Sequence, residues 1–197
     1  MNHDVWVKVL ASTADEVCQH VALGEEARAL LQEAFTLQAF LDLLVAHELF
    51  PDAARLLAYS LPKRDAVWWA CLCIRHVASA DIPPADLAAL EAAERWVIEP
   101  HEAHRRAAMQ AAEGLAFQTA ASWAAVAAFW SNGSMAPPDA SPVMPGEYLT
   151  AQAVSGAVML AAARYAPGVS TDLYRALIVT GMVVAAETRS LPVATAP

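Results

Sequence analysis

The sequence predicts an all-α protein, a single-domain irregular multi-helix bundle of about eight or nine helices. Ala occurs 46 times and Leu 21 times against 7 Gly, and Ala and Leu are among the strongest helix formers. Hydrophobic residues make up 57% and charged residues 17% of the 197 residues, which excludes general disorder. A chain of this length can bury its apolar side chains in a single hydrophobic core. We therefore expect one helical domain over residues 1–189 and a flexible tail over residues 190–197.

Proline and small polar residues mark the helices of the first third of the chain. Ser12 or Thr13 is expected to cap a short helix that reaches about His20, and a turn follows around Gly24. An apolar series of helical period begins after Thr36 and predicts a helix that ends at Phe50. Pro51 suits the first turn of the next helix. The apolar series is Leu37, Phe40, Leu41, Leu44 and Val45.

The most apolar short segment is Ala66–Ile74, which has no polar face. A helix of this kind is normally buried all round, and we expect it to be the central helix. Three more helices follow it. The first begins at Pro83 and Pro84, a more polar one runs from His101 to Glu113, and an Ala-rich one reaches Trp130.

A proline-rich loop is expected over residues 131–146, which hold four of the 12 prolines and show no helical period. Irregular connections of this length are usually functional or mobile. Two last helices are expected, over about residues 147–165 and 171–188.

Charge and segment length exclude two classes of partner. The net charge of −9 repels phosphate backbones, so we expect no nucleic-acid binding. The uncharged segments Leu115–Trp130, Tyr148–Ala163 and Ala176–Ala186 are shorter than the roughly 20 apolar residues of a membrane-spanning helix. We therefore also expect no membrane association.

The cysteines indicate a cytoplasmic protein. Cys71 and Cys73 lie two residues apart in an expected helix and so face opposite ways. With Cys18 the count is odd, which favours free buried thiols in a reducing compartment. Residues 1–8 show no signal-peptide pattern.

No residue pattern indicates catalysis, a cofactor or a metal. His101 and His104 are three apart and followed by Arg105, whereas a zinc-protease helix needs histidines four apart. Glycine-rich phosphate loops are absent from the sequence. We therefore expect a protein that is not an enzyme.

One enzymatic alternative stays open. Arg95 and His101 have a spacing that resembles the Arg and His element of helical ribonucleases of the HEPN superfamily. In such enzymes an arginine holds phosphate and a histidine moves a proton. Pro100 interrupts the element here, and the acidic net charge disfavours RNA.

Large apolar side chains near the proline-rich loop are the candidate contacts for another protein. Aromatic residues and methionines are typical anchors of protein interfaces. A small-residue strip at Ala153, Ala157 and Ala161 allows close helix packing, and a structural homodimer is a further possibility. The candidate partner-binding residues are Trp68, Trp69, Phe129, Trp130, Met135 and Met144.

Two segments resemble a bacterial domain-of-unknown-function family of small helical proteins. They are Phe50–Cys71 and the segment from Ala127 to Ser134 before the loop. The resemblance extends over about residues 37–186, and it implies an association with type VI secretion gene clusters. It implies no catalytic residues. We therefore expect an adaptor or chaperone that binds another protein, with a secretion-system component as one candidate partner.

Overall fold

The computed structural model describes residues 13–32, 35–78, 82–165 and 171–186. These ranges contain ten helices and no strand, so the predicted all-α fold is confirmed, with one or two helices more than expected. The expected tail over residues 190–197 lies outside the described residues. The helices are α1 (Ala14–Cys18), α2 (Glu25–Leu30), α3 (Leu37–Ala46), α4 (Phe50–Ser60), α5 (Lys63–Ala78), α6 (Pro84–Ile98), α7 (Glu102–Gly114), α8 (Ala120–Phe129), α9 (Leu149–Tyr165) and α10 (Thr171–Ala186).

The first helices follow local capping signals. Thr13 caps α1 through a capping box with Glu16, in which each side chain accepts from the other residue's backbone N–H. The helix expected to run to Phe50 ends at Ala46 instead. Glu48 has a φ of +58°, a backbone conformation that a helix cannot contain. The chain then enters α4, whose first turn holds Pro51 as predicted.

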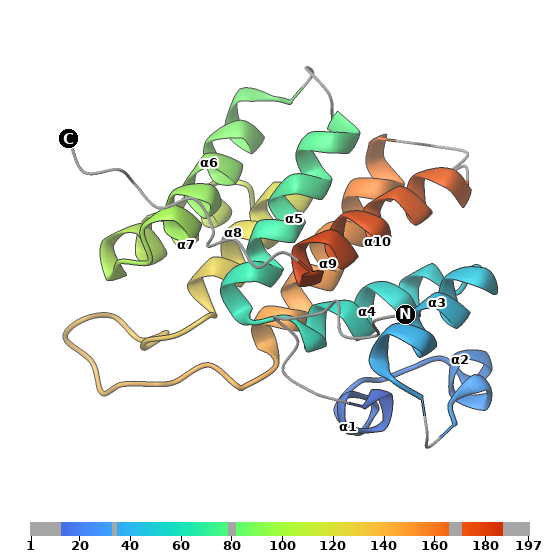
Figure 1. Ribbon diagram of the computed structural model, residues 1–197. Coiled ribbons are helices and arrows are strands. Elements are labelled where there is room, and N and C mark those ends of the chain that lie inside the picture. Colours follow the sequence, from blue (N-terminus) through green and yellow to red (C-terminus); the bar gives the residue numbers. More distant parts are fainter. Residues whose placement is uncertain (1–12, 33–34, 79–81, 166–170, 187–197) are drawn as a thin grey trace.

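Helix α5 lies in the middle of the bundle, against α6, α8, α9 and α10 (Figure 1). This is the segment expected to be the central helix. It is not buried on every side, because Trp68 and Leu72 are half-buried on one stripe of the helix. Trp69, Cys71 and Cys73 are fully buried.

Helix α8 is the most enclosed helix, since nine of its ten residues are buried and Trp123 alone is half-buried. It packs against α6, α7 and α9. Small side chains make this close approach possible. On α9, Ala153, Ala157 and Ala161 are fully buried. The small-residue strip therefore packs inside the protein and is not a homodimer surface.

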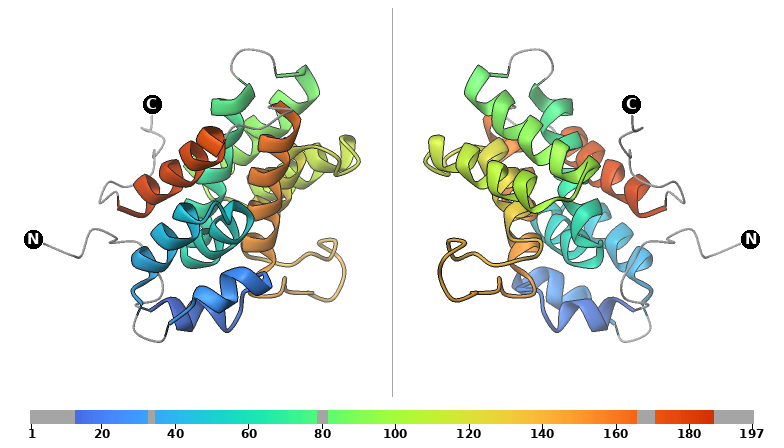
Figure 2. Two further views of the ribbon diagram at one scale, coloured as in Figure 1. Left: turned by 90° about the vertical axis from the view of Figure 1, so that its right-hand side faces the viewer. Right: turned by 90° about the vertical axis from the view of Figure 1, so that its left-hand side faces the viewer.

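The proline-rich segment 131–146 connects α8 to α9 and projects beyond the helices (Figures 1 and 2). It has no regular secondary structure, as predicted. Within the ranges that the structure describes, none of the helices has both the length and the apolar run required to cross a bilayer.

Candidate functional site

The candidate site is the surface formed by α7 and the proline-rich loop, and it is organised by a buried arginine. Arg105 shares one face of α7 with Ala108 and Ala112, at spacings of three and seven residues. This face points into the bundle, and Arg105 is only 1% exposed. A buried guanidinium needs hydrogen-bond acceptors around it.

Arg105 has acceptors from three parts of the chain. Its Nε and Nη2 donate to the two carboxylate oxygens of Glu102, at 2.6 and 2.8 Å. Its Nη1 donates to the carbonyl oxygen of Phe129 at 2.6 Å, and Nη2 also donates to that of Ser134 at 2.8 Å. The guanidinium carbon lies 4.4 Å from the centre of the Phe129 ring, a cation–π contact. One side chain thus connects α7, the end of α8 and the loop.

Arg106 adds a second connection between α7 and the loop. Its Nε donates to Glu102 at 2.7 Å, and its Nη2 donates to the carbonyl oxygens of Ala136 at 3.0 Å and Ser134 at 3.3 Å. The hydrogen bonds from Arg105, supported by the one from Arg106, lower the pKa of Glu102 to about 2. Glu102 is therefore ionised at neutral pH and holds both arginines in place.

The two limbs of the loop are also bonded to each other. The Ser134 hydroxyl oxygen accepts from the N–H groups of Ala136 and Val143, both at 3.0 Å. The N–H of Met135 donates to the carbonyl oxygen of Val143 at 2.7 Å. These bonds close the base of the loop. The projecting part therefore has a defined backbone path although it is irregular.

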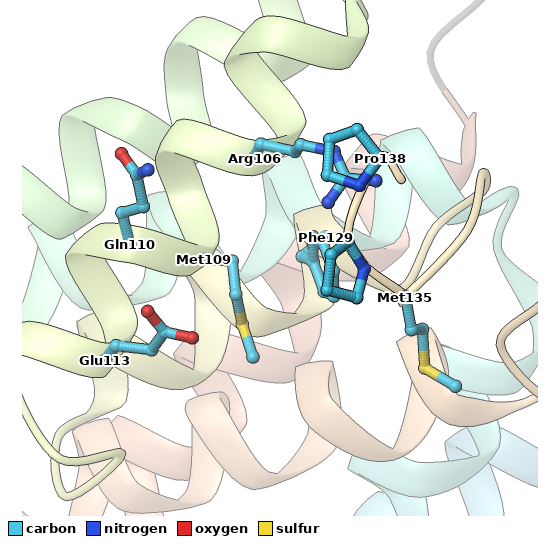
Figure 3. Close-up of a pocket in the computed structure, with 8 residues that line it drawn as sticks. Arg106, Met109, Gln110, Glu113, Phe129, Met135 and Pro138 are labelled. Atoms are coloured by element: carbon cyan, nitrogen blue, oxygen red, sulfur yellow. The ribbon is translucent and has the colours of Figure 1, made fainter. Parts of the chain in front are cut away.

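A groove of about 400 Å³ lies between α7 and the loop (Figure 3). Side chains from α7 form one wall, and the end of α8 and the loop form the other. Pro138 lies beside the Arg106 guanidinium in this view. The volume is enough for one or two large side chains of a partner. The lining residues are Arg106, Met109, Gln110, Glu113, Phe129, Met135, Pro137 and Pro138.

The structure brings together three of the six residues predicted to bind a partner. Phe129 and Met135 line the groove. Phe129 itself is almost fully buried, so only part of its ring can be contacted. Met144 does not line the groove, but it stands on the returning limb of the same loop and is 63% exposed.

The three predicted tryptophans lie elsewhere. Trp69 is fully buried, and its indole N–H donates to the Leu177 carbonyl oxygen at 2.9 Å, so its inclusion in a partner surface was wrong. Trp68 is half-buried on α5 and packs against the core. Trp130 is half-buried and forms an edge-to-face pair with Trp123 at 6.2 Å.

Sequence reasoning missed Arg105, Met109 and Val143. The spacing of Arg105 to Ala108 and Ala112 was a usable signal, because it places the arginine on the apolar face of its helix. Met109 reaches the groove from the edge of that face. Nothing in the local sequence of the loop distinguishes Val143, which is 52% exposed.

Arg95 and His101, the two residues of the alternative ribonuclease hypothesis, do not line a common cavity. Arg95 lines a separate cavity, whose other charged lining residues are Glu91, Glu94 and Glu99. His101 is not among the residues that line it. The His101 ring instead contacts that of His104, with 5.8 Å between the ring centres. Arg75 is paired with Glu94, but Glu91 and Glu99 still outweigh the charge of Arg95, which disfavours a phosphate.

Comparison with known protein families matches residues 40–185 to a family of unknown function, DUF6931. The chain belongs to this family. The matched residues extend from α3 into α10, so the DUF6931 region includes both α7 and the loop. The family description assigns no activity and gives no link to type VI secretion. Comparisons with curated proteins and with solved structures found no match.

Proposed function

We propose that this DUF6931 protein is a non-catalytic adaptor or chaperone that binds another protein through the α7–loop surface, defined here as the groove together with Val143 and Met144. One observation carries the proposal. Met144 and Val143 are the two most exposed large hydrophobic side chains of the described residues, at 63% and 52%. They stand on a loop whose base is hydrogen-bonded to Arg105 and Arg106.

A fixed backbone that exposes apolar side chains suits recognition. When a partner covers exposed apolar groups, their removal from water lowers the free energy of the complex. A preformed loop loses less conformational entropy on binding than a disordered one. Met135, on the same loop as these side chains, lines a groove together with Met109, and a large apolar side chain of the partner fits in this groove. Methionine adapts its shape to such an insertion.

We also propose the cellular compartment and the kind of partner. The free cysteines Cys18, Cys71 and Cys73 support a reducing compartment such as the cytoplasm. On the sequence resemblance alone we propose a type VI secretion component as the first partner to test, since the family description itself gives no such link.

The test is the recovery of the partner from the native host with a tagged protein. We expect the double variant Val143→Ser/Met144→Ser to recover at least about tenfold less partner, because two anchors of the interface are removed. The matched control is Val179→Ser/Val183→Ser, which changes two α10 side chains that are 47% and 50% exposed. Equal recovery with the loop variant and the control variant contradicts the proposal.

A further inference from the structure

The wall of the groove that α7 forms carries a charge at each end and a methionine between them. Arg106, Met109, Gln110 and Glu113 all line the groove. Residues three and four positions apart share one face of a helix, so these side chains form one strip along α7. The Glu113 side chain points toward Met109 in the close-up (Figure 3). The strip therefore places a carboxylate at the edge of the apolar part of the groove.

The positive end of the strip is already bonded within the protein. Arg106 lies seven positions before Glu113, which is roughly 10 Å along the helix axis. Its Nε donates to Glu102 at 2.7 Å, and its Nη2 donates to the carbonyl oxygens of Ser134 and Ala136. This guanidinium holds the loop in place, so a partner does not need to supply its acceptors.

The negative end of the strip has no such partner. Glu113 is exposed and makes no hydrogen bond or ion pair with any residue that the structure describes. The same is true of Asp139, which follows the groove residue Pro138 on the loop. The net charge of −9 adds to the negative potential of the molecule. The charges that remain available to a partner at this surface are therefore negative.

The position of Glu113 next to apolar side chains determines which partner it tolerates. A segment that fills the groove over Met109 and Met135 also covers part of the Glu113 carboxylate. Removing a carboxylate from water without pairing it costs free energy. A positive charge on the partner avoids this cost, whereas a negative charge adds repulsion.

We propose that the segment bound by the α7–loop surface is basic as well as apolar, an inference that rests on the proposed function. One large apolar side chain of the partner enters the groove at Met109 and Met135. A lysine or arginine close to it along the partner chain pairs with Glu113. The long stem of such a residue also covers apolar surface. The apolar contact supplies most of the affinity, and Glu113 selects the sign of the charge.

The spacing of the two partner residues follows from α7. Met109 and Glu113 are four positions apart, which is about 6 Å along a helix. In an extended peptide, side chains two positions apart share one face and lie about 6.6 Å from each other. An extended partner segment therefore reaches both residues when its apolar and basic side chains are separated by one residue.

The experiment is an NMR titration of the full chain labelled with ¹³C at its methionine methyl groups. The probes are the capped peptides Gly-Leu-Gly-Lys-Gly, Gly-Leu-Gly-Glu-Gly and Gly-Ser-Gly-Lys-Gly. We expect the Leu/Lys peptide to shift the Met109 and Met135 signals saturably and to leave Met159 and Met182, which do not line the groove, unchanged. The Leu/Glu peptide should bind about tenfold more weakly, and the Ser/Lys peptide should not saturate below about 10 mM.

Glu113→Gln tests the assigned charge, and the exposure of Glu113 means that the fold does not depend on it. This variant should bind the Leu/Lys peptide about threefold more weakly than the parent and should bring the affinities of the Leu/Lys and Leu/Glu peptides within about twofold. The matched control is Glu91→Gln. It removes an exposed carboxylate of α6 that lines a separate cavity, and it should keep the tenfold preference.

Three results would overturn the inference. They are the absence of saturable shifts at Met109 and Met135, equal affinity of the parent for the Leu/Lys peptide and either other peptide, and a preference for lysine that survives Glu113→Gln. Each is distinguishable from a failure of the proposed function. That proposal is tested separately, by the recovery of the native partner with the Val143→Ser/Met144→Ser variant.

Discussion

The guanidinium group of Arg105 lies directly against the backbone of Gly133. A β-carbon built on Gly133 would lie 3.0 Å from three atoms of that guanidinium. Gly133 also has a φ of +67°, a conformation that favours glycine. The carbonyl oxygen of the next residue, Ser134, accepts a hydrogen bond from Arg105. The path of the loop therefore depends on the absence of a side chain at position 133.

Gly133→Ala should lower the free energy of unfolding by about 1–3 kcal/mol, because it combines backbone strain with displacement of a buried guanidinium. Urea unfolding measures this. The same variant should also recover less partner, since the loop is the proposed contact. Gly114→Ala is the matched control, because a β-carbon there meets no atom within 4 Å. The control should change stability by less than about 1 kcal/mol. Equal losses in both variants would show that the Arg105 contact does not matter.

The ion pairs of Glu102 with Arg105 and Arg106 should make the stability of the protein fall at acid pH. The pKa of Glu102 is about 2 in the folded protein, against roughly 4.3 for glutamate in an unfolded chain. Its contribution to stability is therefore fully present above about pH 4.3 and is lost as the pH falls toward 2. Unfolding experiments between pH 5 and pH 2 should show a shallower loss for Glu102→Gln than for the parent. Parallel pH profiles would be evidence against this ion pair.

Local sequence signals predicted most of the helices, but they missed α2 and misplaced the end of α3. The capping residue Thr13 and the first-turn Pro51 mark true helix starts. Helix α2 was missed because Ala27 is its one buried residue, which leaves no apolar period over six residues. The end of α3 was misplaced because the turn after it uses Glu48 with positive φ. Glycine or asparagine at that position would have marked the helix end.

The sequence predicted which segment and which kinds of residue form the candidate site, but not the direction of each side chain. The loop and the aromatic end of α8 are visible in the sequence, and Phe129 and Met135 do line one groove. The direction of each tryptophan is not visible. Trp68 and Trp69 point about 100° apart on a helix, and the choice between them depends on α10. That helix supplies the Leu177 carbonyl oxygen, 108 positions along the chain from Trp69.

Gly181 should be the least tolerant glycine of the helices. A β-carbon there would lie 2.5 Å from Leu57 Cδ2 and 2.7 Å from Trp69 Cε2, both fully buried side chains. Gly181→Ala should therefore lower the free energy of unfolding by about 1–3 kcal/mol through overpacking. Thermal unfolding monitored by tryptophan fluorescence should also show a changed Trp69 environment.

Gly156→Ala separates this packing effect from the general preference of helices for alanine. Gly156 lies within α9, and a β-carbon there meets no atom within 4 Å. Alanine should therefore raise the free energy of unfolding by up to about 1 kcal/mol. Opposite signs for the two substitutions are the expected result. A stabilising Gly181→Ala would mean that α10 does not pack against Trp69 as described.

The three thiols should differ in their reaction with iodoacetamide. Burial, reinforced by the nearby Asp15 carboxylate, raises the pKa of Cys18 to about 11. The pKa values of Cys71 and Cys73 are also raised, chiefly by burial. At pH 8 Cys18 should react about a hundredfold more slowly than a free cysteine, since the thiolate is the reactive form. Cys71 and Cys73 are buried in α5 and should react only after unfolding, because the reagent cannot otherwise reach them. Mass spectrometry of tryptic peptides measures each rate. Labelling of Cys71 in the native protein as fast as that of Cys18 would mean that α5 opens to solvent.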